Sequence, residues 1–82
     1  MFIRRTSMNL INGSKKTMKL ILEPWAREYK IRPDETVQIL ARGKNESLIE
    51  VEYNDDGNLT VYGWSDDMRI MRDGEELEPF AD

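Results

Sequence analysis

Hydrophobic and polar positions alternate in four short runs in the C-terminal half of the chain. Alternation with a period of two is typical of a strand that turns one face toward a core. Turn residues separate the runs: Asn54 to Asn58 suits a three-residue loop with Gly57 at positive φ, and Asp73-Gly74 suits a type I′ turn. The pattern predicts one four-stranded antiparallel meander, with strands at residues 48–53, 59–64, 67–72 and 75–77.

The first turn sets the register of this predicted meander. The opposed pairs are Tyr53 with Leu59, Val51 with Val61 and Ile49 with Gly63. These side chains share one apolar face with Met68, Ile70 and Leu77. The connection at Ser65-Asp66 is the weakest of the three turns. A one-residue slip would turn a whole apolar set toward water, so agreement among the turns supports the register.

A second group of short elements precedes the meander. Apolar positions alternate from Met18 to Leu22 and again from Val37 to Ala41, with a turn at residues 32–35 and an end at Gly43. The pattern favours two or three strands. Residues 24–30 leave an alternative open, because Pro24 suits the first turn of a helix and Trp25 and Tyr29 have the spacing of one helical face.

Together these elements predict an all-β fold, a small β-sandwich or flattened barrel of six or seven short antiparallel strands. The alternative is an α+β fold with a short helix at residues 24–30. The stretch from Tyr29 to Ile39, a strand, a Pro-Asp-Glu turn and a strand, resembles the turn layout of cupin-type jelly rolls. That family's metal-binding histidines are missing here, so the resemblance implies no metal chemistry.

Residues 1–17 form a basic leader with no clear helical or strand period. Three interpretations stay open: a flexible tail, a segment docked on the acidic sheet of its own or a neighbouring chain, or a part outside the native domain, such as a targeting leader. The prediction places a single β domain at residues 18–78 and a short tail at 79–82.

Composition narrows the possible chemistry. The chain has 82 residues with no Cys and no His, so thiolate nucleophiles, disulfides and the commonest general base are missing. Glu50 and Glu52 share a strand face, but exposed glutamates on a flat sheet are ordinary. The loop at residues 54–58 fails the EF-hand pattern, because Gly63 stands where the bidentate glutamate is needed. We expect no enzymatic activity, no metal and no cofactor.

Charge is distributed unevenly along the chain. Residues 1–20 carry five basic residues and no acid, whereas residues 47–82 carry eleven acids and two arginines. An acidic sheet repels nucleic acid and anionic membranes, so both are unlikely partners. No apolar run is long enough to span a bilayer and the start lacks the apolar core of a secretory signal, so we expect a cytoplasmic protein.

The predicted outer face of the meander carries the best functional candidates. Tyr62 and Trp64 lie there with Leu48 and Met71, and Trp25 is a further exposed-aromatic candidate. Aromatic patches of this kind mark binding surfaces, although the tryptophans can equally pack into the core. The sequence therefore predicts a noncatalytic module that binds another protein or itself, including as a homodimer. The alternative is binding of a small ligand or carbohydrate on these rings.

Overall fold

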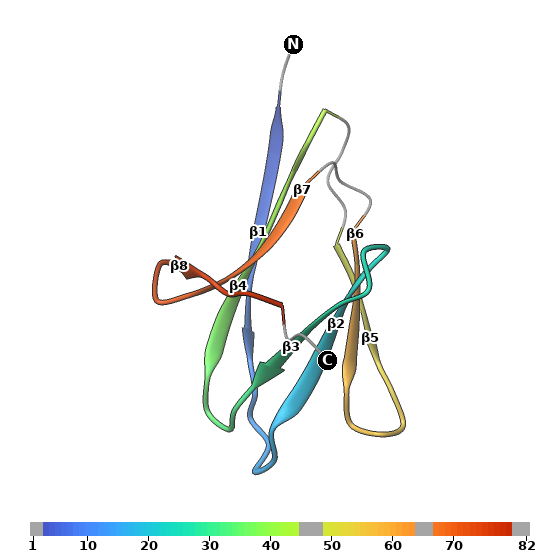
Figure 1. The fold of residues 1–82 in the computed structure, drawn as a ribbon, viewed down its shortest axis with the longest axis vertical. Helices are drawn as coiled ribbons and strands as arrows, with labels where there is room; N and C mark the ends of the chain where they lie inside the picture. The colour runs from blue at the N-terminus through green and yellow to red at the C-terminus, as the bar shows by residue number, and fades with distance from the viewer. Residues whose placement is uncertain (1–2, 45–48, 64–66, 80–82) are drawn as a thin grey trace.

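Two four-stranded sheets face each other in a computed structural model that describes residues 3–44, 49–63 and 67–79 (Figure 1). Sheet A has the strand order β1-β4-β7-β8, and sheet B has the order β3-β2-β6-β5. The strands are β1 (Arg4–Ile11), β2 (Met18–Glu23), β3 (Arg27–Ile31), β4 (Thr36–Gly43), β5 (Ile49–Tyr53), β6 (Leu59–Gly63), β7 (Asp67–Arg72) and β8 (Glu75–Glu76).

The predicted fold class is confirmed as an all-β sandwich. The described residues hold eight strands, one more than the upper expectation, and no helix. The alternative helix at residues 24–30 is therefore wrong: residues 24–26 form a turn, and β3 follows it. The two strands of the cupin-like stretch, β3 and β4, lie in different sheets.

The two strongest turn predictions are confirmed. Gly57 has φ of 84° and its amide donates to the Asn54 carbonyl at 2.9 Å, so β5 and β6 pair in the predicted register with Tyr53 opposite Leu59. Asp73 and Gly74 have φ of 50° and 82°, as a type I′ turn requires. Each turn acts within a few residues, which is why local sequence was sufficient to identify it.

The prediction that these four strands form one meander is wrong. Strand β6 pairs with β2 in parallel and with β5, whereas β7 pairs with β4 and β8. The chain therefore changes sheet between Gly63 and Asp67. A single meander would leave its apolar face in need of a separate cover, but here the two hairpins enter opposite layers and their apolar faces cover each other.

The N-terminal segment is part of the sandwich. The expectation of a flexible leader at residues 1–17 is not met by residues 4–11, which form β1 and pair with β4 along their whole length. Met8 and Leu10 are half-buried against the core. Only two positions of β1 on the core side, Met8 and Leu10, are apolar. This alternation of apolar and polar residues is too short to predict a strand from the sequence alone.

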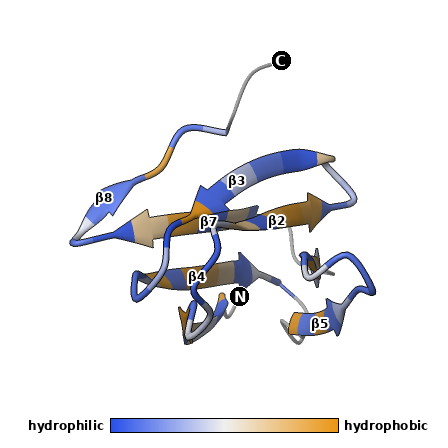
Figure 2. Ribbon diagram, turned by 90° about the horizontal axis from the view of Figure 1, so that it is seen from below, coloured by the Kyte–Doolittle hydropathy of each residue, from blue (hydrophilic) through white to orange (hydrophobic). Residues whose placement is uncertain are grey.

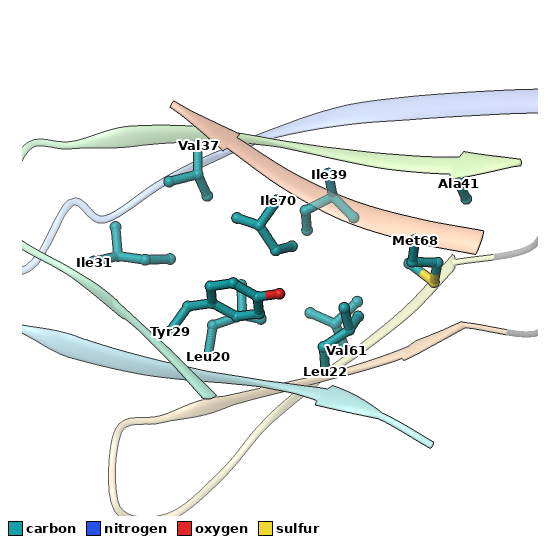
Figure 3. Packing of buried hydrophobic residues seen from close by; sticks show 10 residues of the cluster. All are labelled: Leu20, Leu22, Tyr29, Ile31, Val37, Ile39, Ala41, Val61, Met68 and Ile70. Carbon is teal, nitrogen blue, oxygen red and sulfur yellow. The ribbon is translucent and has the colours of Figure 1, made fainter. Parts of the chain in front are cut away.

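The core lies between the two sheets and draws on both. In Figure 3 the core-side side chains of β2, β3 and β6 point toward those of β4 and β7. The buried cluster is Leu20, Leu22, Tyr29, Ile31, Val37, Ile39, Ala41, Val61, Met68 and Ile70. The Met68 side chain covers Gly63 of the opposite sheet so closely that a Cβ placed on Gly63 would overlap the Met68 sulfur.

A carboxylate links the β3–β4 turn to β7. Glu35 Oε1 accepts hydrogen bonds from the backbone nitrogen of Arg32 at 2.7 Å and from Nη2 of Arg72 at 3.1 Å. The hydrogen bonds from the Arg32 side chain and backbone hold the pKa of Glu35 below its ordinary value of 4.5. Arg72 Nη2 also donates to the Lys30 carbonyl at 3.3 Å, so this cluster ties sheet A to sheet B.

Glu35→Gln should remove a contribution to stability that depends on pH. Because the folded pKa lies below 4.5, the carboxylate stabilises the fold above that pH, and the contribution is lost as pH falls through the folded pKa. Urea unfolding at several pH values should show the largest difference between native and variant chains near neutrality and a shrinking one in acid. Glu75→Gln on exposed β8 is the control, and a difference that stays constant down to acid pH would contradict the role of Glu35.

Candidate interaction surface

The two sides of the sandwich end in different ways. On one side the end of β7 lies near β3, since Arg72 of β7 donates to the Lys30 carbonyl of β3 at 3.3 Å, and β8 follows β7 at this edge of sheet A (Figure 2). Strand β8 has only two residues, both glutamates, and β3 carries exposed charged side chains. Short and charged edges resist pairing with further strands, so this side is protected.

The opposite side ends in β1 and β5, because each is the other edge strand of its sheet. Figure 2 places β5 on the side away from β3 and β8. The core-side residues of β5 are poorly covered there: Tyr53 is 74% exposed and Val51 is 42% exposed. Their neighbours on β6, Leu59 and Val61, are 7% and 0% exposed. Sheet B thus extends past the cover that sheet A provides.

We call this side the open edge and define it by Met8 and Leu10 of β1 and Val51 and Tyr53 of β5. All four side chains belong to the inner faces of their sheets, since Met8 and Leu10 pair with buried Ile39 and Val37 of β4. Among the described residues, each of these strands pairs with a neighbouring strand on one side only, so its other side is an open sheet edge. The open edge therefore combines apolar side chains with free hydrogen-bonding capacity.

The two strands of the open edge run side by side at matched levels and in the same direction. In sheet A, Thr6 is paired with Ala41, which is paired with Met68. Met68 contacts Gly63 of sheet B, and Gly63 is paired with Ile49. Thr6 and Ile49 therefore lie at the same height along the strand direction.

Contacts at the other end of the two strands give the same relative height of β1 and β5. Asn12 Nδ2 donates to the Ile31 carbonyl at 2.9 Å, and Ile31 is opposite Met18. Asn12 and Met18 are therefore at the same height, and so are Leu10 and Leu20, each two residues farther into its strand. Leu20 is paired with Leu59, and Leu59 is paired with Tyr53, so Leu10 and Tyr53 also lie at the same height. Both strands also run downward in Figure 1.

The outer faces of the two edges have opposite charge. On β1 the outward row begins with Arg5, which lies beside Arg42 of β4. A depression of about 370 Å³ there is also lined by Arg69 and by Asp67, which form an ion pair at 3.1 Å. On β5 the outward row holds Glu50 and Glu52. The outward row of β1 thus carries one basic side chain, Arg5, whereas that of β5 carries two acidic ones.

Tyr62 lies on this acidic face and is half-buried. Its hydroxyl donates to Glu52 Oε1 at 3.4 Å. The negative charge of Glu52, with smaller effects from desolvation and from Glu23 and Glu50, raises the pKa of Tyr62 above its ordinary value. The phenol therefore stays protonated at neutral pH and acts as a donor within an acidic row.

The structure separates residues that the sequence placed in one patch. Tyr62 faces outward from sheet B, whereas Met71 pairs with Gln38 on the outward row of sheet A. The two point away from opposite layers because β6 and β7 are not neighbours. Leu48 and Trp64 lie outside the described residues. Tyr62 and Met71 therefore do not share the face that the predicted patch of Leu48, Tyr62, Trp64 and Met71 required, since that face depended on the meander.

Trp25 lies in the β2–β3 turn and packs partly against the core, with the Arg27 guanidinium 5.6 Å from its ring centre. Trp25 and Tyr62 share none of the three described depressions. Binding of a small ligand or carbohydrate on these rings stays a prediction.

Val51 and Tyr53 are the surface residues that sequence reasoning missed. They were assigned to the core face, which is the correct face, but β5 extends beyond its cover. The alternation in IEVEY is that of a fully covered strand, so no local signal indicates the exposure.

Within the described ranges, no cluster of acidic side chains has the arrangement of a metal site, and no helix is long and apolar enough to cross a membrane. A scan against protein-family models finds no match for this chain, and searches of curated proteins and of solved structures find none either. The geometry of the open edge is therefore the feature of the molecule from which a function can be inferred.

Proposed function

We propose that this chain is a noncatalytic protein-interaction module that adds a partner strand at its open edge. One observation carries the proposal: Tyr53 is 74% exposed although it stands on the inner face of its sheet. An apolar inner face left in water costs roughly 25 cal/mol for each Å² that a partner can cover. A partner strand would cover this face and pair the free backbone groups of the edge.

The chemistry of the chain supports a binding role over catalysis. The sequence has no Cys and no His, the residues that most often act as nucleophile and general base. Glu50 and Glu52, the acids of β5, lie on an exposed outward row and line none of the three described depressions. The remaining feature of this side is its capacity to pair and to bury apolar surface.

Photo-crosslinking in the native host tests the proposal. A benzoylphenylalanine placed at position 51 should yield a discrete adduct heavier than the chain, whereas the same group at position 36 should not. Thr36 is the matched control because its side chain is exposed on the outward row of β4, beside Ile11 of β1, and does not lie on the inner face that the open edge presents. Mass spectrometry of the adduct identifies the partner. No adduct from position 51, or the same adducts from both positions, would overturn the proposal.

A further inference from the structure

We propose that the strand received by the open edge belongs to a second copy of this chain. In this two-fold dimer, β1 of each copy lies beside β5 of the other. The inference rests on the proposed function and deepens it by naming the partner. It follows from three properties of the open edge: the position of both strands on one side, their matched levels, and the complementarity of their faces.

The position of the strands makes one symmetry operation sufficient. Both edge strands lie on the same side of the sandwich and run in the same direction. A rotation of 180° about an axis parallel to the strands brings the two open edges together and exchanges the layers. Sheet A of one copy then continues into sheet B of the other at both seams, and the contact is closed. Outward faces remain outward, so no strand has to turn over.

The matched levels bring apolar side chains together on the inner face. Since Thr6 is level with Ile49 in each copy, the rotation sets Met8 beside Val51 of the second copy and Leu10 beside Tyr53 of the second copy. These are the four residues of the open edge. The dimer therefore covers the side chains whose exposure motivated the proposed function, and it pairs a β1 of eight residues with a β5 of five.

On the outer face of each seam, polar side chains and one arginine of β1 meet the two glutamates of β5. Ser7 and Asn9 stand level with Glu50 and Glu52 of the second copy, and Arg5 is a diagonal neighbour of Glu50 within reach of its side chain. The other two-fold arrangement would pair β5 with β5 and gather four glutamates on one outward row. Like charges on adjacent strands oppose pairing, so the β1–β5 arrangement is favoured.

A cysteine pair tests this arrangement, and the native chain contains no cysteine to interfere. Adjacent strands lie about 4.8 Å apart, within the separation that a disulfide bridges. Asn9→Cys with Glu52→Cys in one chain should give, under mild oxidation, about tenfold more covalent dimer than either single variant, because only the pair places two sulfurs within bonding distance at a seam. Positions 9 and 52 face outward from opposite layers, so they cannot join within one chain.

The single variants separate the alternatives. A covalent dimer from Asn9→Cys alone would indicate β1–β1 pairing, and one from Glu52→Cys alone would indicate β5–β5 pairing; either result would overturn the β1–β5 arrangement. Arg27→Cys with Glu75→Cys on the protected side is the matched control and should give no covalent dimer between copies. Equal yields from this control would also overturn the proposal.

The native chain supplies a measurement that does not depend on the variants. Light scattering across micromolar concentrations should give twice the chain mass of 9.7 kDa. A monomer at every concentration would overturn the dimer. If position 51 still forms a crosslink to a different protein in the host, the interaction module stands and only the second copy is wrong. If position 51 forms no adduct at all, both fail.

Discussion

Replacing Asn12 with alanine is expected to lower the free energy of unfolding by about 2–4 kcal/mol. Asn12 is fully buried just after β1, where it links the β1–β2 loop to the end of β3 and to the β3–β4 turn. Its Nδ2 donates to the carbonyls of Ile31 at 2.9 Å and Lys16 at 2.8 Å, and its Oδ1 accepts from the Ser14 hydroxyl at 2.7 Å. Alanine would leave the buried Ile31 carbonyl without this donor, and that desolvation is the main cost.

Urea denaturation of both chains measures the difference. Gln38→Ala, on the exposed outward row of β4, is the matched control and should change stability by less than about 0.5 kcal/mol. Asn12→Asp provides a second variant of the same shape: its carboxylate keeps the acceptor for Ser14 but cannot donate to the two carbonyls, so it should also be strongly destabilised. If Asn12→Asp were as stable as the native chain, the donor role of Asn12 would be wrong.

Gly63→Ala is expected to destabilise the chain by about 1–3 kcal/mol through overpacking. A Cβ at this position would overlap the Met68 sulfur, and Met68 is 1% exposed, so its side chain has little room to withdraw. The contact lies between the two sheets, and it also sets the matched levels of β1 and β5. A backbone shift that relieves the overlap would therefore disturb the open edge as well as the core.

A double-mutant cycle isolates this contact. Met68→Ala alone should cost about 2–5 kcal/mol by leaving a cavity. In that background Gly63→Ala should cost far less than in the native chain, because the space for its Cβ is now free, which gives a coupling of about 0.5–3 kcal/mol. Additive effects of the two substitutions would show that the overlap is relieved elsewhere and would contradict the close approach at Gly63.

Local sequence was sufficient for the elements whose cause is local. The type I′ turn at Asp73-Gly74 and the loop at residues 54–58 depend on residues that tolerate positive φ, and both turns formed with the predicted pairing across them. The same holds for β4, which ends at Gly43 as predicted. Alternation also assigned the inner and outer faces of β5 correctly, because side-chain direction alternates along any strand.

Pairing between strands that are distant in sequence could not be predicted from local patterns. Strand β6 pairs in parallel with β2, about forty positions away, and not with β7. Turn residues do not determine a pairing of this kind, because parallel strands are not joined by a tight turn. Strand β1 became visible only through its register with β4. The predicted patch of Tyr62 and Met71 failed for the same reason, since its two halves depended on a pairing that the sandwich replaced.

The sequence by itself determined the all-β class, two hairpins, the faces of β5, and the absence of Cys and His. Only the tertiary structure decided which strands became edges and how far each layer was covered. The physical reason is that alternation and turn residues report the direction of a side chain relative to its own strand. The solvent exposure of a side chain depends instead on whether the opposite sheet covers it. Tyr53 of sheet B is exposed because sheet A does not extend over it.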